Sequence, residues 1–201
     1  MTEISYIDEL KKFAKDNGLN CSTNRDIRKH VALVGNPYTK YEYVVMDLPR
    51  KDKNMHLVFS DTRTGNAGGS YAYCGLFLKI PVCKNEVKIR PRFFIDRFSS
   101  SKRHKTDNSF IDKKVTIFKS NNESIPFNTE STVIRKFLEL NSKLGPLELV
   151  SICKSMSFIP LLYGNNWLAI QLKRRWLFEP DQINRLIEMG SDVLLKAKIN
   201  I

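Results

Sequence analysis

Three stretches of the chain repeat their apolar residues with the spacing of an amphipathic helix, at residues 3–16, 129–143 and 181–189. In the first stretch Ile7 and Leu10 fall on one face, and Pro180 fits the first turn of the last helix. We expect Gly190 to interrupt this last helix, with residues 192–199 continuing as a separate turn or two.

Most of the remaining apolar residues alternate with polar ones, which is the pattern of half-buried strands. The polar turn at residues 49–54 lies between two such runs and predicts a β-hairpin. Residues 71–80 are apolar on both faces, so we expect an interior strand that is covered on both sides. The expected strands are residues 41–48, 55–60, 71–80, 86–94, 115–118, 147–153, 157–163 and 166–178.

The short connections between successive strands favour antiparallel pairing. We therefore expect an α+β fold with a mainly antiparallel sheet and three or more helices. A polar, basic and serine-rich segment at residues 97–109 is the expected mobile loop. It divides the chain into an N-terminal α+β half, residues 1–96, and a C-terminal α+β half, residues 110–201. The pattern leaves open whether the halves are two small subdomains or parts of one compact domain.

The 201 residues are 42% hydrophobic, which is enough to form a core, and their formal net charge is +12. The excess is evenly spread, because residues 1–100 and 101–201 each carry six more Lys and Arg than Asp and Glu. A uniformly basic body attracts polyanions and acidic partners without specifying any of them. No apolar run approaches the roughly 20 residues that span a bilayer, and the acidic, amphipathic start is unlike a secretory signal. We expect a cytoplasmic location, with peripheral attachment to the inner face of the membrane as an alternative.

Cysteine spacing indicates neither a zinc site nor a redox motif. A chain of this length does not need disulfides to fold, so we expect free thiols, no structural metal and no cofactor. The four cysteines are Cys21, Cys74, Cys83 and Cys153.

Several short motifs occur in a distinctive order between residues 70 and 180. They are Gly75-Leu-Phe77, Phe110, the run at residues 115–121, the leucine-rich helix at residues 133–140, Trp167-Leu-Ala-Ile170 and Leu177-Phe-Glu-Pro180. In this order the chain resembles the uncharacterised bacterial domain-of-unknown-function 3137 family. Many members of that family carry a membrane-spanning hairpin before this domain, and this chain has no such apolar run. The resemblance implies no catalytic residues.

Motifs of catalysis are scarce. The sequence contains no phosphate-binding loop and no nucleophile elbow, and His30, His56 and His104 are scattered. Glu86-Val-Lys88 and Asp112-Lys-Lys114 lie on strand-like segments and fit an acid-x-Lys pattern. In metal-dependent nucleases the carboxylate of this pattern holds the metal and the lysine steadies the attacking water. Such tripeptides arise easily by chance in a chain with 33 Lys and Arg, so we assign no catalytic residue.

Basic side chains fall together on the faces of two predicted strands. Lys88, Arg90 and Arg92 share one face of residues 86–94, and Lys173 and Arg175 share a face of the later strand with Gln171 and Trp167. Basic side chains beside an exposed aromatic suit phosphate contacts and base stacking. A solvated sheet face of a basic protein gives the same pattern. The candidate polyanion-binding residues are Lys88, Arg90, Arg92, Lys173, Arg175 and Trp167.

Two classes of function follow from this pattern. The first is a non-enzymatic binding protein whose basic surface meets an acidic protein or an anionic membrane surface. The second is a nucleic-acid-binding protein. Within this class a metal-dependent nuclease is the less favoured interpretation. The even spread of charge favours the first class.

Overall fold

A computed structural model of the chain describes residues 6–24, 39–64, 70–97, 103–106, 108–120 and 124–198. Within these residues the fold is one nine-stranded sheet in the order β1-β2-β3-β4-β9-β8-β5-β7-β6, and neighbouring strands are antiparallel. The strands are β1 (Cys21–Asn24), β2 (Thr39–Asp47), β3 (Met55–Thr64), β4 (Ser70–Ile80), β5 (Val87–Pro91), β6 (Arg103–His104), β7 (Val115–Lys119), β8 (Leu147–Ile152) and β9 (Asn166–Lys173). The helices are α1 (Tyr6–Asp16), α2 (Ser109–Lys114), α3 (Ser131–Leu144), α4 (Pro180–Ala197) and the 3-10 helix η1 (Phe94–Arg97). The prediction of an α+β fold with a mainly antiparallel sheet is confirmed.

Strands from both halves of the chain share this sheet. The predicted hairpin forms, since β2 pairs with β3. The central strand β4 pairs with β9, and β5 pairs with both β7 and β8. The division into two halves at residues 97–109 stays a prediction.

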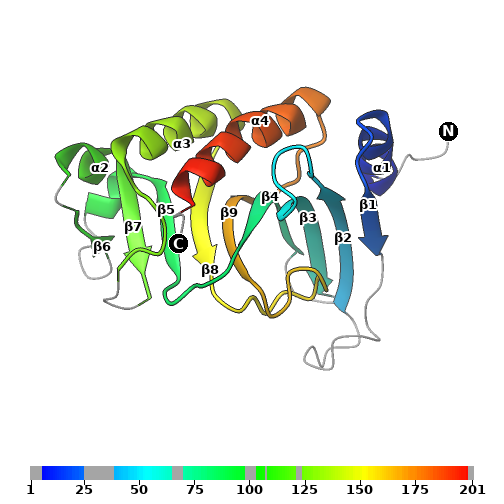
Figure 1. The fold of residues 1–201 in the computed structure, drawn as a ribbon, viewed down its shortest axis with the longest axis horizontal. Helices are drawn as coiled ribbons and strands as arrows, with labels where there is room; N and C mark the ends of the chain where they lie inside the picture. The colour runs from blue at the N-terminus through cyan, green and yellow to red at the C-terminus, as the bar shows by residue number, and fades with distance from the viewer. Residues whose placement is uncertain are drawn as a thin grey trace.

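The main core lies between one face of the sheet and the helices (Figure 1). α3 and α4 lie side by side on this face. α4 packs over β4 and β9, α3 packs over β8, and α1 covers β1 and β2. Alternate strand residues point into this core, as Leu76 and Leu78 do in β4 and Ile170 does in β9. None of the described helices combines the length and the apolar character needed to cross a bilayer.

Gly190 does not interrupt the last helix, contrary to the prediction. α4 continues through it to Ala197. A Cβ atom at Gly190 would lie 3.2 Å from Cδ2 of Leu76 and 3.7 Å from Cδ1 of Ile170. The glycine therefore lets the helix approach the central strands closely, at a cost in helix propensity of about 1 kcal/mol.

Residues 157–163 form turns instead of the predicted strand. Ile159 and Leu162 are buried on the face of the sheet opposite to α1, α3 and α4, against Val58, Phe77 and other apolar residues of the strands. The apolar residues of this segment thus reach the core by folding over the sheet rather than by pairing within it. We call residues 155–165 the covering turn.

The strand predicted at residues 166–178 ends at Lys173. Arg174 has a φ of 70°, which breaks the extended conformation, and the alternation of side chains stops there. Trp176 then lies against Phe59, and its indole nitrogen donates to the carbonyl oxygen of Ser60 at 2.9 Å.

The predicted mobile loop falls partly outside the described residues, which omit residues 98–102 and 107. In its described part, Arg103 and His104 form the short edge strand β6, and Asn108 caps α2 by accepting from the backbone of Phe110 at 3.0 Å. The greater mobility of this segment stays a prediction.

The prediction of four free thiols is wrong for two of the cysteines. Cys83 and Cys153 form a disulfide that links the β4–β5 connection to the segment after β8. The two cysteines are 70 residues apart in the sequence, so only the pairing of the strands brings them together. Cys21 is free and exposed, while Cys74 is free and buried.

We expect thiol titration of the denatured, unreduced protein to find two thiols per chain rather than four. In the native protein Cys21 should react much faster than Cys74, because Cys21 is exposed, whereas Cys74 is buried and burial raises the pKa of its thiol to about 12. Mass spectrometry of a tryptic digest should show peptides linked through Cys83 and Cys153. Four reactive thiols without a reductant would contradict the disulfide.

We expect Gly75→Ala to destabilise the protein by about 3 kcal/mol. A Cβ atom at this position would lie only 2.4 Å from the carbonyl oxygen of Ile170 in β9, and a paired backbone cannot move aside easily. Urea unfolding followed by tryptophan fluorescence measures the change. Gly190→Ala is the control and should shift stability by no more than about 1 kcal/mol, because its new Cβ meets only side-chain methyl groups. An unchanged unfolding midpoint for Gly75→Ala would refute the close β4–β9 approach.

Candidate functional site

The face of the sheet opposite to α1, α3 and α4 brings together three of the six candidate residues. Lys88 and Arg90 project from β5 on this face, opposite to the buried Val87 and Ile89. Lys173 projects on the same side from β9, and Lys88 and Lys173 reach the same carboxylate. Two strands from distant parts of the sequence thus contribute to one basic cluster.

Glu148 is the residue that joins the two lysines. Its Oε1 lies 3.5 Å from Nζ of Lys88, and its Oε2 lies 2.6 Å from Nζ of Lys173. Register explains the arrangement, because Glu148 pairs with Gln171 and Lys88 pairs with Val150, so both lysines are diagonal neighbours of Glu148. The side chain of Glu148 is only 17% exposed, so its charge lies beneath the lysines.

Arg90 is held by a second carboxylate. Its Nη2 donates to Oδ1 of Asp96 at 2.5 Å, and the other oxygen of Asp96 accepts from the hydroxyl of Thr116 at 2.8 Å. The Arg90 guanidinium also lies 4.8 Å from the ring centre of Phe93 and 5.3 Å from that of Phe118. Ionic and cation–π contacts therefore fix the orientation of Arg90.

A groove of about 420 Å³ opens on this face. Residues of β5, β7, β8 and β9 line it together with the adjoining Glu86 and Ser120, and Phe118 lies beneath Lys88, whose Nζ is 5.5 Å from the ring centre. We call it the sheet-face groove. Its lining residues are Glu86, Val87, Lys88, Phe118, Lys119, Ser120, Val150, Ser151, Ile152, Gln171 and Lys173.

Arg92 and Arg175 lie outside the basic cluster, and Arg90, which belongs to it, is not among the residues that line the groove. β5 ends at Pro91, and Nη1 of Arg92 donates to the carbonyl oxygen of Asp112 in α2 at 2.8 Å. Arg175 follows the break at Arg174, and its guanidinium donates to the carbonyl oxygen of Leu144 at the C-terminus of α3. This end of a helix attracts cations, so Arg175 has a structural partner.

Trp167 is fully buried, contrary to its prediction as an exposed aromatic. The covering turn lies over it, and the indole nitrogen donates to the carbonyl oxygen of Leu162 at 3.1 Å. The Trp167 ring also meets Phe77 edge-on at 6.2 Å. It therefore offers no surface on which a base can stack.

Sequence reasoning missed Glu148 and Phe118. A signal for both was present in the alternation, because Glu148 lies between Leu147 and Leu149, which enter the main core, and Phe118 follows Ile117, which also enters it. The prediction grouped only basic residues, so it omitted Glu148, the acidic residue at the centre of the cluster.

The two nuclease-like tripeptides do not form one site. Asp112 lies on α2 rather than on a strand, and its Oδ1 accepts from the backbone and hydroxyl of Thr106 at 2.9 and 3.1 Å. Glu86 borders the sheet-face groove. No group of three or more potential metal ligands occurs among the described residues.

No family model, no curated protein and no solved structure matches this chain. Similarity to the domain-of-unknown-function 3137 family therefore stays a prediction. Its motifs lie in β4, α2, β7, α3, β9 and the segment that leads into α4, and among the described residues only the β7 motif reaches the groove.

Proposed function

We propose that the protein is a non-enzymatic binding module whose sheet-face groove holds an acidic segment of a partner protein. The observation that carries the proposal is the placement of a carboxylate between two lysines in a concave, partly apolar surface. Lys88, Lys119 and Lys173 line the groove against one acidic residue, Glu86, and Glu148 lies beneath them.

The mixed charge of the groove favours a protein segment over nucleic acid. Glu86 and Glu148 would repel the phosphate that every nucleotide carries, whereas a peptide can place uncharged residues beside them, and the half-buried Phe118 already carries Lys88 and Arg90 over its ring. A peptide presents both carboxylates and backbone amides. The side-chain amide of Gln171, which lines the groove, can form hydrogen bonds with those backbone amides. The concave shape also suits a protein segment better than a flat bilayer.

Nucleic-acid binding remains the second candidate, favoured by the exposed ring of Phe93 beside Arg90 and by the exposed Phe94 that follows it in the sequence, which are 46% and 70% exposed. The two candidate functions are distinguished by measuring the affinity of the same variants for an acidic peptide and for a single-stranded oligonucleotide.

The cytoplasmic location remains a prediction, and so does attachment to the inner face of the membrane. The Cys83–Cys153 disulfide weighs against both, because disulfides persist mainly in oxidising compartments. A binding function is compatible with either compartment.

We expect Lys88→Glu combined with Lys173→Glu to weaken binding of a fluorescein-labelled, glutamate-rich peptide at least about tenfold at low salt. The cause is the loss of two attractive charges and the addition of two repulsive ones. Fluorescence anisotropy measures the affinity. Lys53→Glu combined with Lys113→Glu is the matched control, since both lysines are exposed and lie outside the groove. Equal loss in both double variants would show only an effect of net charge and would contradict the site.

We expect Glu148→Gln to tighten binding of the same peptide by about three- to tenfold. The amide keeps the shape of the side chain but releases Lys88 and Lys173 from their internal partner, so that both can meet the ligand. Glu139→Gln on α3 is the control and should leave the affinity unchanged. Unchanged or weaker peptide binding by Glu148→Gln would argue against the proposal.

A further inference from the structure

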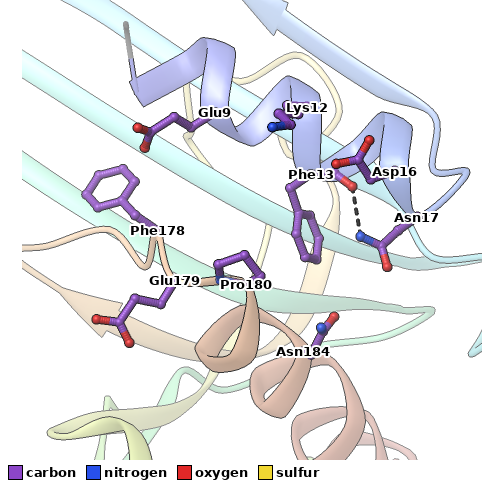
Figure 2. A pocket seen from close by; sticks show the side chains of 9 residues that line it. All are labelled: Glu9, Lys12, Phe13, Asp16, Asn17, Phe178, Glu179, Pro180 and Asn184. Atoms are coloured by element: carbon purple, nitrogen blue, oxygen red, sulfur yellow. Dashed lines mark hydrogen bonds between the residues drawn. The ribbon is translucent and has the colours of Figure 1, made fainter.

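A second concave surface lies between α1 and the start of α4, and it shares no residue with the sheet-face groove. Its volume is about 590 Å³, and apolar atoms contribute most of its lining surface, although many of the lining residues are polar or charged. Figure 2 shows Phe13, Phe178 and Pro180 between the two helices, with the acidic side chains around them. We call this the α1–α4 cleft. The lining residues are Glu9, Lys12, Phe13, Asp16, Asn17, Phe178, Glu179, Pro180 and Asn184.

Helical spacing explains why α1 supplies one wall. Ile7, Leu10 and Ala14 bury one face of α1 in the main core. Glu9, Lys12, Phe13 and Asp16 follow one another at three- and four-residue intervals along the adjoining face, which borders the cleft. The buried stripe thereby fixes the positions of the two α1 carboxylates.

Aromatic rings make the cleft suitable for a cation. Phe178 stacks on Tyr6, with ring centres 4.5 Å apart and planes 24° from parallel, and Trp176 lies 6.1 Å from Phe178 on centres. Figure 2 shows the carboxylates of Glu9 and Glu179 on either side of the Phe178 ring. A positive group over such a ring gains a cation–π contact as well as two ionic partners.

The charge of the cleft is opposite to that of the whole chain. Three carboxylates, of Glu9, Asp16 and Glu179, border it with one ammonium group, of Lys12, whereas the chain as a whole is +12. Among the described residues, Glu9 and Asp16 have no ion-pair or hydrogen-bond partner for their carboxylates, and Glu179 accepts from Nε2 of Gln182 at 2.7 Å. The cleft therefore keeps acidic groups available to a ligand.

We infer that the α1–α4 cleft is a docking site for a basic segment of a partner protein, with an Arg or Lys side chain over Phe178 between Glu9 and Glu179. Charge complementarity identifies the occupant. Glu9 and Asp16 are seven residues apart on α1, about 10 Å along the helix, which matches about three residues of an extended peptide. A second copy of this chain is disfavoured because two bodies of charge +12 repel each other. The inference is independent of the proposed function, since it concerns another surface and a ligand of opposite charge.

The test is titration of a fluorescein-labelled extended peptide of about ten residues that carries arginines three residues apart. We expect the wild-type chain to bind it and Glu9→Gln/Asp16→Asn/Glu179→Gln to bind at least about tenfold more weakly at low salt. The matched control, Glu42→Gln/Glu130→Gln/Glu139→Gln, makes the same change in net charge elsewhere and should bind like wild type. Phe178→Leu keeps every charge and should still weaken binding severalfold, because the cation–π contact is lost.

Other outcomes would overturn the inference. They are absence of binding by wild type, equal loss in the two triple variants, and undiminished binding by the cleft variant. Self-association in sedimentation runs that only the cleft variant abolishes would identify a second copy as the occupant and overturn the inference as well. The cleft variant should retain its affinity for the glutamate-rich peptide, so failure here is distinguishable from failure of the proposed function.

Discussion

The pairing of β4 with β9 is the constraint on which the rest of the structure depends. It joins strands from the first part of the sequence to strands from the second, and both faces of the pair are covered. Leu76 and Ile170 lie beneath α4, while Phe77 and Trp167 lie beneath the covering turn. Gly75 permits the close approach of the carbonyl of Ile170, so the pair tolerates little change in side-chain volume.

The sheet-face groove begins where this cover ends. The covering turn buries Trp167 at the start of β9, whereas Gln171 and Lys173 near its end line the open groove. Tyr73, the cross-strand partner of Lys173, marks the boundary, since its ring packs against the apolar residues under the covering turn and burial raises the pKa of its hydroxyl. One face of one sheet thus provides both a second small core and a polar surface.

The charges of the two concave surfaces differ in a way that net charge does not reveal. In the sheet-face groove lysines lie above a carboxylate of the protein itself, and in the α1–α4 cleft carboxylates surround aromatic rings. A chain of charge +12 therefore presents local surfaces of both signs. Local pairing, more than total charge, decides which ligand each surface can hold.

Alternation and helical spacing were sufficient to predict the fold class, the hairpin of β2 and β3, the interior position of β4 and three of the helices. They also placed Lys88, Arg90 and Lys173 on exposed strand faces, because the direction of a side chain within a strand is a local property. The same reasoning failed for Arg92 and Arg175, which lie just beyond the ends of their strands.

Tertiary structure alone decided the partners of these residues. Trp167 is buried because the covering turn folds back over it, and residues 157–163 become that turn because their apolar side chains reach the sheet face without pairing. Glu148 meets two lysines, and Cys83 meets Cys153, only through the register of strands far apart in the sequence. Local patterns determine which face a residue occupies. What lies opposite that face depends on long-range pairing, which no short segment of the sequence encodes.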